Sequence, residues 1–186
     1  LAPLTGPLCT LRELTKADAR SLFTHLTTEE VARFISPPPT TVEGFEAFID
    51  WTHQERRNGR YLCYGVVPHG LTEAVGLFQV AISEKAATGE WGFALGSAYW
   101  GSGLFMTGAR RILRFAFTEL GLHRLEARAM VANLRGNAAL RKSGAVKEGL
   151  LRGAFERYGE RFDQFLWVIT RGAWRSGLGR RRNDHR

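Results

Sequence analysis

Cysteine, methionine and proline are scarce in this chain, and long apolar runs are missing. The 186 residues include two cysteines, two methionines and six prolines. Cys9 and Cys63 match no metal-binding or redox spacing, and the histidines show no ligand pattern, so we expect no bound metal. No apolar run approaches the ~18 residues of a membrane span, and the first residues lack the basic and apolar regions of a secretion signal. We therefore expect a cytoplasmic protein that has no membrane partner.

The composition is that of an ordinary globular protein, with 44% hydrophobic and 24% charged residues. The net charge of +8 is unevenly distributed, because residues 171–186 contain six arginines against one aspartate, a net +5 that leaves +3 for the rest. We expect one folded domain over 1–174 and a basic, flexible tail over 175–186. Such a tail could touch RNA or acidic partners, or it could be a solvated chain end.

Hydrophobic periodicity predicts a single α+β domain with a mixed, mostly antiparallel sheet of about seven strands flanked by about four helices. A near capping box at Thr15 and Asp18 begins the first helix, and Gly121 ends the longest one. The expected order is β-α-α-β-β-β-α-β-α-β-β: strand 8–14, helices 16–26 and 41–58, strands 61–67, 74–82 and 90–95, helix 104–120, strand 124–131, helix 133–144, and hairpin 145–156 with 161–170.

Gly101 and Gly103 flank the point where strand 90–95 gives way to the longest helix. The first N–H groups of a helix have no intrahelical partner, and glycines allow a bulky anion to approach the backbone closely. The segment therefore favours a diphosphate-binding loop, although a tight turn that needs two glycines would give the same pattern. It is neither a P-loop nor a Rossmann loop, because it lacks G-K-[ST] and a third glycine.

Two motifs in this order resemble the GNAT acyl-CoA N-acyltransferase superfamily, and in particular its RimJ/RimL-type branch of ribosomal-protein N-terminal acetyltransferases. The first is W-G-S-G-L-F, from Trp100 to Phe105. The second is N-L-R-G-N-A-A-L-R-K-S-G-A-V-K-E-G, which begins at Asn133. The resemblance implies a GNAT-like fold and an acetyl-CoA-dependent N-acetyltransferase. Its acceptor would be a primary amine on a peptide N-terminus or a small molecule, and it would act as a monomer or homodimer.

The same resemblance implies which residues contact acetyl-CoA. The backbone of the strand end would pair with the pantetheine arm, the loop would hold the diphosphate, and polar residues of helix 133–144 would reach the arm, the phosphates or the adenosine. These candidates are Phe93, Ala94 and Leu95; Trp100, Gly101, Ser102, Gly103, Leu104, Phe105 and Met106; and Asn133, Asn137 and Arg141.

Glu90 and Asn133 are the catalytic candidates. An attacking amine must be neutral, so a base or a water chain has to remove its proton. Glu90 opens its strand and shares a face with Gly92 and Ala94, and we expect its carboxylate to be partly desolvated; the alternative is a solvated strand end. Asn133 could bond the pantetheine or orient a water, or could act as an ordinary helix N-cap.

Four positions depart from the family pattern, one of which is Ala145 in place of the usual phenylalanine. Phe105 replaces a small residue of the loop, so its side chain must point away or narrow the site. Gly136 replaces the usual serine, and Leu140 stands where the family often places an acid tyrosine. These departures keep open a non-catalytic acyl-CoA-binding or regulatory protein. The tail keeps open a basic nucleic-acid-associated protein, although nucleic acid is the less favoured partner because the folded part carries little charge.

Overall fold

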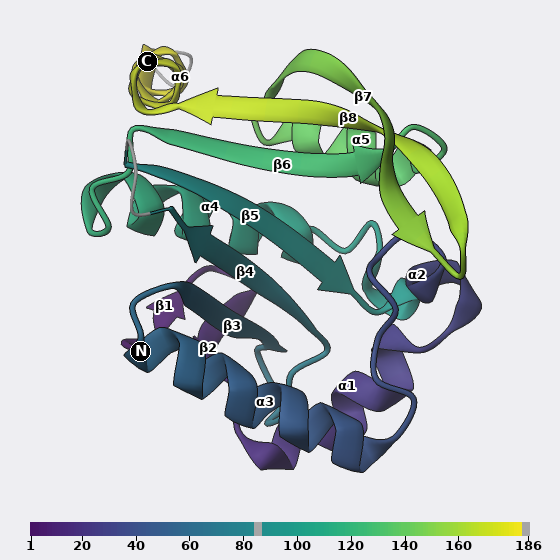
Figure 1. The fold of residues 1–186 in the computed structure, drawn as a ribbon. Helices are drawn as coiled ribbons and strands as arrows, with labels where there is room; N and C mark the ends of the chain where they lie inside the picture. Colours follow the sequence, from purple (N-terminus) through teal and green to yellow (C-terminus); the bar gives the residue numbers. More distant parts are fainter. Residues whose placement is uncertain (84–86, 184–186) are drawn as a thin grey trace. The chain divides into compact units, whose positions relative to one another are not determined.

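The computed structural model describes residues 1–83 and 87–183. Its strands are β1 (Leu4–Thr5), β2 (Cys9–Glu13), β3 (Tyr61–Pro68), β4 (Gly76–Ile82), β5 (Thr88–Leu95), β6 (Arg124–Met130), β7 (Val146–Arg157) and β8 (Glu160–Thr170). The α-helices are α1 (Ala19–Leu26), α2 (Glu29–Ala32), α3 (Val42–Arg57), α4 (Leu104–Thr118), α5 (Leu134–Lys142) and α6 (Arg171–Asn183), and short 3₁₀ turns cover Lys16–Asp18 and Ser97–Tyr99. Figure 1 shows these elements along the chain.

The expected order of elements is confirmed, and three short or terminal elements are added to it. Strand β1 has two residues and helix α2 has four, which is too short for a periodic signal. Helix α6 continues directly from β8 and includes 175–183, where the sequence indicated a basic tail. The boundary between a domain over 1–174 and a tail over 175–186 stays a prediction, and residues 184–186 lie outside the described residues.

The strands follow the order β1-β2-β3-β4-β5-β6-β8-β7. Strand pairs β1–β2, β2–β3, β3–β4, β6–β8 and β7–β8 are antiparallel, whereas β5 and β6 run parallel from Thr88↔Arg124 to Glu90↔Glu126. By their contacts the residues fall into two compact units, one of 1–82 with 91–114 and one of 83–90 with 115–186. Strand β5 therefore contributes its beginning to the second unit and its end to the first.

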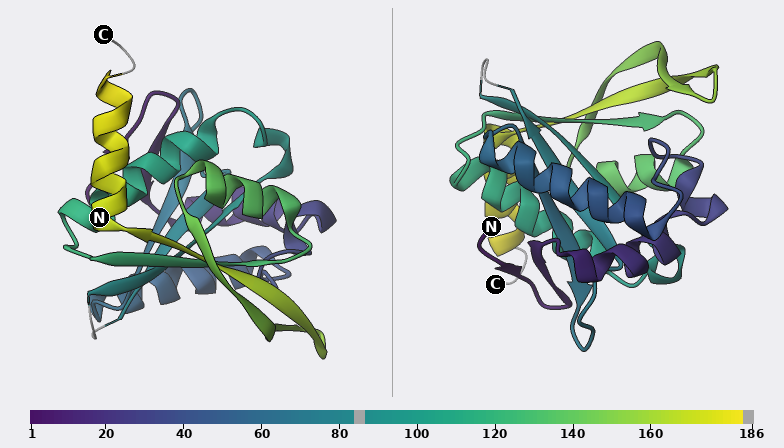
Figure 2. Two further views of the ribbon diagram at one scale, coloured as in Figure 1. Left: turned by 90° about the horizontal axis from the view of Figure 1, so that it is seen from above. Right: turned by 60° about the horizontal axis from the view of Figure 1, so that its bottom comes forward.

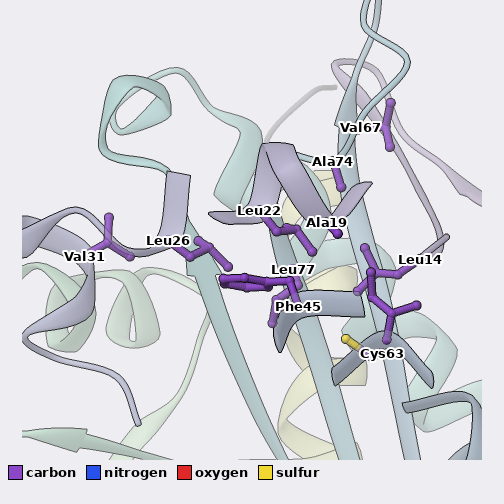
Figure 3. Packing of buried hydrophobic residues seen from close by; sticks show 11 residues of the cluster. Leu14, Ala19, Leu22, Leu26, Val31, Phe45, Cys63, Val67, Ala74 and Leu77 are labelled. Atoms are coloured by element: carbon purple, nitrogen blue, oxygen red, sulfur yellow. The ribbon is translucent and has the colours of Figure 1, made fainter. Parts of the chain in front are cut away.

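In the first unit, helices α1 and α3 pack on one face of the strands (Figure 1). Their apolar stripes meet side chains of β3 and β4 and of the segments next to β2 and β4 in a buried cluster, which Figure 3 shows. The cluster consists of Leu14, Ala19, Leu22, Leu26, Val31, Phe45, Ile49, Cys63, Val67, Ala74 and Leu77. Cys63 is thus a small core residue, as expected, and both cysteines are free and buried.

A buried carboxylate ties three segments of this unit together. Asp18 is fully buried, and both of its oxygens accept hydrogen bonds from Arg12 at 2.8 Å. It also accepts the backbone N–H of Thr15 at 2.8 Å and of Ala74 at 2.9 Å. Burial alone would raise the pKa of Asp18, but these hydrogen bonds and the Arg12 charge lower it below its ordinary value.

Aromatic rings fill the space between the strands of the first unit and helix α4. Phe78 of β4 stacks on Trp91 of β5 at 6.4 Å between ring centroids and on Phe105 of α4 at 5.9 Å. Phe93 lies 4.5 Å from Phe105. Gly108 makes room for these rings, because a Cβ there would lie 2.3 Å from the Phe78 ring. The start of α4 is therefore fixed against the sheet by packing rather than by charge.

The second unit contains the antiparallel strands β6, β8 and β7 with helices α5 and α6. Asn137 of α5 is buried beneath this sheet and accepts the indole N–H of Trp167 at 2.8 Å. Helix α6 extends from the end of β8 (Figure 2). Its first turn is docked, since Trp174 packs on Phe117 at 5.4 Å and Arg171 Nε donates to the Leu122 carbonyl at 2.8 Å.

Among the described residues, no helix combines the length and the apolar character needed to cross a bilayer. In the same residues, no group of three or more His, Cys, Asp or Glu side chains could hold a metal ion.

Candidate active site

The loop between β5 and α4 has the backbone conformation that the sequence predicted. Gly101 has φ 78° and Gly103 has φ 88°, in the left-handed region where glycine is favoured. Residues 101–103 are exposed, whereas Leu104 at the start of α4 is buried. The two glycines therefore let the chain turn sharply on the surface and enter the helix at once.

Hydrogen bonds of Ser102 hold this turn. Its hydroxyl donates to the Tyr99 carbonyl at 2.6 Å and accepts the N–H of Leu104 at 3.3 Å. The first helical bond of α4 runs from the N–H of Thr107 to the Gly103 carbonyl at 3.0 Å. By helix geometry the N–H groups of Phe105 and Met106 have no carbonyl one turn earlier inside the helix. The positive end of the helix dipole thus lies at an exposed turn.

Several side chains of the loop point into the protein. Trp100 packs against the buried cluster of the first unit and donates its indole N–H to the Leu95 carbonyl at 2.8 Å. Phe105 belongs to the aromatic cluster, so of the two expected arrangements its side chain adopts the one that points away from the loop. For Trp100, Leu104 and Phe105, only backbone groups remain to serve a bound anion, while Met106 is half-buried.

Space beside the glycines suits the approach of a bulky anion. A Cβ on Gly101 would have nothing within 4 Å, and a Cβ on Gly103 would lie 3.1 Å from one methyl group of Leu8. A diphosphate needs several convergent N–H donors at a helix start, and this turn presents them without a blocking side chain. The residues therefore fit a diphosphate group.

The end of β5 leads into this loop within the same unit. Phe93 contributes its ring to the aromatic cluster, and Ala94 packs against the buried cluster on the other face. The Leu95 carbonyl already accepts the Trp100 indole, which uses one of its two acceptor positions. Backbone pairing with a pantetheine arm stays a prediction for these three residues.

Glu90 differs from the expectation in its surroundings. Its carboxylate is 45% exposed and lies 3.0 Å from Nη1 of Arg128, which is 42% exposed. The carboxylate is thus partly exposed, and it is paired with a cation that the sequence did not indicate. Register explains the pairing: Glu90 stands opposite Glu126 in the parallel ladder, and the two acidic residues are neutralised separately, by Arg128 and by Arg124.

Asn133 acts as the N-cap of α5, because its Oδ1 accepts the N–H of Gly136 at 2.8 Å. A Cβ on residue 136 would lie 2.4 Å from Nδ2 of Asn133. The glycine that replaces the family serine thus makes room for this cap conformation. Among the described residues no acceptor is found for the Asn133 Nδ2 group, so the cap leaves two donors for a ligand.

Asn137 is hydrogen-bonded inside the protein, and its expected contact with the cofactor stays a prediction. The residue is 9% exposed, and its Nδ2 donates to the carbonyls of Met130 at 2.9 Å and Asn133 at 2.8 Å. Its Oδ1 accepts the Trp167 indole. With its polar atoms used inside the protein, Asn137 has a structural role. Arg141 is exposed in the last turn of α5, and a contact with cofactor phosphates stays a prediction there.

The structure brings the predicted residues together in two groups, one in each unit. The first unit joins the end of β5 to the loop and to α4; the second joins Glu90, Asn133, Asn137 and Arg141 with their partners. The sequence analysis missed Arg128, which pairs with Glu90, and His25, whose ring meets that of Tyr99 just before the loop. Arg128 sits on the same face of its strand as Glu126, but only the parallel register could reveal its partner. His25 gave no motif at all.

Comparisons with known proteins show to which family this chain belongs. The family model described as an acetyltransferase (GNAT) domain matches residues 9–146. The uncharacterized N-acetyltransferase YoaA of Bacillus subtilis is 26% identical over 170 residues, which covers 87% of this chain and 92% of that protein.

Solved structures share the fold along most of its length. Mycobacterium smegmatis RimJ in complex with CoA-disulfide has a TM-score of 0.81 and 24% identity, covering 91% of this chain and 86% of that one. RimL, the ribosomal L7/L12 α-N-protein acetyltransferase, in complex with coenzyme A has a TM-score of 0.80 and 16% identity, covering 91% and 98%. The single α+β fold is thus GNAT-like, and the chain belongs to the GNAT family of acetyltransferases and is an N-acetyltransferase.

Proposed function

We propose that this protein transfers the acetyl group of acetyl-CoA to a primary amine, on a peptide N-terminus or a small molecule, by direct attack in a ternary complex. The observation that carries the proposal is the turn at Gly101 and Gly103, which presents the N-terminus of α4 at an exposed surface. RimJ and RimL, which share the fold, have been solved with coenzyme A compounds. Acetyl-CoA would be the cosubstrate.

The loop would bind the diphosphate through backbone groups. The N–H groups of Gly101 and Gly103 and the unpaired ones in the first turn of α4 would donate to the diphosphate, and the helix dipole favours negative charge there. Ser102 contributes indirectly, because its hydroxyl holds the turn closed. The pantetheine arm would then follow the backbone of Phe93, Ala94 and Leu95, and Asn133 remains a candidate for contact with the cofactor.

The reaction requires the amine to lose a proton as it forms a bond to the thioester carbon. Glu90 is the candidate base, and the nearby Arg128 holds its carboxylate in place. The C–N bond forms, the C–S bond breaks, and the thiolate leaves. Leu140, where the family often has an acid tyrosine, is 1% exposed and apolar, so water would return the proton to the thiolate.

The acceptor is proposed to be a peptide or a small neutral amine rather than a polycation. The charges on the acceptor-side helices support this proposal, because Glu29 and Glu30 of α2 and Glu43 and Glu46 of α3 are scattered rather than concentrated. A polyamine or aminoglycoside would favour a dense acidic surface.

The two alternative functions, a non-catalytic acyl-CoA-binding protein and a nucleic-acid-associated protein, lose part of their support. Phe105 and Gly136 suggested a non-catalytic protein, but Phe105 packs inward and Gly136 makes room for the Asn133 cap. The Arg-rich tail suggested a nucleic-acid-associated protein, but Arg171 and Trp174 at the start of α6 are used to dock this helix.

A thermal-shift scan against acetyl-CoA, coenzyme A and RNA separates the three functions. A ligand that binds only the folded state raises its melting temperature. We expect a rise with acetyl-CoA and with coenzyme A, followed by release of free thiol in a turnover screen over N-terminal peptides and small amines. A rise with acetyl-CoA but no thiol release with any amine would favour the non-catalytic alternative, and a rise with RNA alone would favour the nucleic-acid-associated one.

A further inference from the structure

We infer that His25 is a positioning residue of the loop between β5 and α4, which contains Gly101 and Gly103. This inference rests on the proposed function. His25 lies near the end of α1, far in sequence from the loop. Its ring meets that of Tyr99 edge to face, with 5.3 Å between ring centroids and 78° between planes. Tyr99 is the last residue of the 3₁₀ turn that precedes the loop.

The His25 side chain also touches the backbone at the other end of this turn. A Cβ on Gly96 would lie 2.9 Å from Cβ of His25 and 3.0 Å from its Cγ and Nδ1. Gly96 is buried and has φ −51°, so its conformation does not require glycine. The close approach of His25 gives the reason for a glycine there.

From this contact a short chain of hydrogen bonds leads to the N-terminus of α4. The N–H of Tyr99 donates to the Gly96 carbonyl at 2.9 Å. The Tyr99 carbonyl accepts the Ser102 hydroxyl at 2.6 Å, and Ser102 in turn accepts the N–H of Leu104. His25 thus contacts both ends of the 3₁₀ turn that leads into Gly101 and Gly103.

Other hydrogen bonds of this segment involve its backbone and the Trp100 indole. The N–H of Gly96 donates at 3.0 Å to the carbonyl of Val75, the residue before β4, and the Trp100 indole donates to the Leu95 carbonyl. Those bonds fix the two ends of the segment but do not fix the Tyr99 ring. Burial lowers the pKa of His25, which keeps the imidazole neutral near pH 7, as an apolar contact requires.

The inference is tested by calorimetric titration of the full-length protein with acetyl-CoA. We expect His25→Ala to raise Kd about two- to tenfold, the equivalent of one aromatic pair. His25→Phe keeps a ring against Tyr99 and should stay within about twofold of the wild type. His123→Ala, at an exposed histidine of the second unit, is the matched control and should not change Kd. At saturating acetyl-CoA, kcat should be unchanged in all variants.

Equal Kd values for the wild type, His25→Ala and His25→Phe would overturn the inference. A fall in kcat without a change in Kd would overturn it as well, because the effect would lie elsewhere. If His25→Ala does not fold, His25→Leu keeps the contact with Gly96 but lacks the ring, and the same rise in Kd is expected. A wild type that does not bind acetyl-CoA would contradict the proposed function itself, which is a separate result.

Discussion

The carboxylate of Glu90 lies 3.0 Å from the guanidinium of Arg128, on neighbouring parallel strands. The ion pair is about half exposed, so by itself it contributes little to stability. The pair would instead matter for catalysis, because the guanidinium of Arg128 would hold the carboxylate of the candidate base in position.

Glu90→Gln should slow acetyl transfer at neutral pH and leave acetyl-CoA affinity nearly unchanged. Glutamine keeps the volume but cannot accept the proton of the amine, and loss of a general base typically costs about 10²–10⁴-fold in rate. Steady-state kinetics on a confirmed acceptor measure the effect. Turnover within about threefold of the wild type would mean that the base is elsewhere.

Arg128→Gln should slow the reaction less than Glu90→Gln, and the double variant should be no slower than Glu90→Gln alone. The reason is that Arg128 would act only through the carboxylate that it orients, so the two effects should not add. The four kcat/KM values of this cycle are the measurement. Strictly additive losses would show that Arg128 has a separate function.

Gly101→Ala should weaken acetyl-CoA binding, whereas Gly121→Ala should not. Both glycines have positive φ, 78° and 68°, and neither has an atom within 4 Å of an added Cβ. Each substitution should therefore cost about 1–2 kcal/mol of stability for the left-handed conformation. Urea unfolding measures the loss of stability that the two variants share, and calorimetry measures the change in acetyl-CoA affinity. Equal affinities in the two variants would remove the diphosphate assignment from the loop.

Gly103→Val should also abolish binding, but its interpretation is less direct. A Cβ at this position would lie 3.1 Å from the Leu8 side chain, so the substitution disturbs packing as well as the approach of an anion. Circular dichroism must show a folded variant before the loss is assigned to the loop.

Asp18 should make the stability of the protein depend on pH in the acid range. Its pKa is lowered in the folded state, so its contribution is fully present above the unfolded pKa of about 3.9 and is lost as pH falls through the folded pKa. Urea unfolding at pH 7 and at pH 3 measures this change. Asp18→Asn should cost about 3 kcal/mol at pH 7, because it leaves Arg12 without its partner, and should reduce the acid dependence. An equally steep acid dependence in that variant would assign it to other carboxylates.

Removal of residues 176–186 should leave both acetyl-CoA affinity and thermal stability nearly intact. Among the residues whose side chains the structure describes, Arg171 and Trp174 dock α6, and the truncated chain retains both. Trp174→Ala should instead lower stability by about 1–2 kcal/mol through the lost packing on Phe117. Melting curves of the two variants distinguish the cases. A large loss on truncation would show that the end of α6 is docked as well.

The sequence by itself determined the order of the elements and the position of the loop. Apolar periodicity is a local property, and Gly101, Gly103 and Gly121 stand where the backbone must be left-handed, so these features could be predicted without a partner. The Thr15–Asp18 pairing was local too and is confirmed.

Only the tertiary structure decided which side chains meet. Parallel register brought Arg128 to Glu90, burial against Trp167 made Asn137 structural, and packing of α1 brought His25 to Tyr99. Phe105 turned inward because Gly108 leaves room for the Phe78 ring. Each of these contacts joins residues from different elements, and their distance depends on strand register and helix packing, which no local pattern encodes.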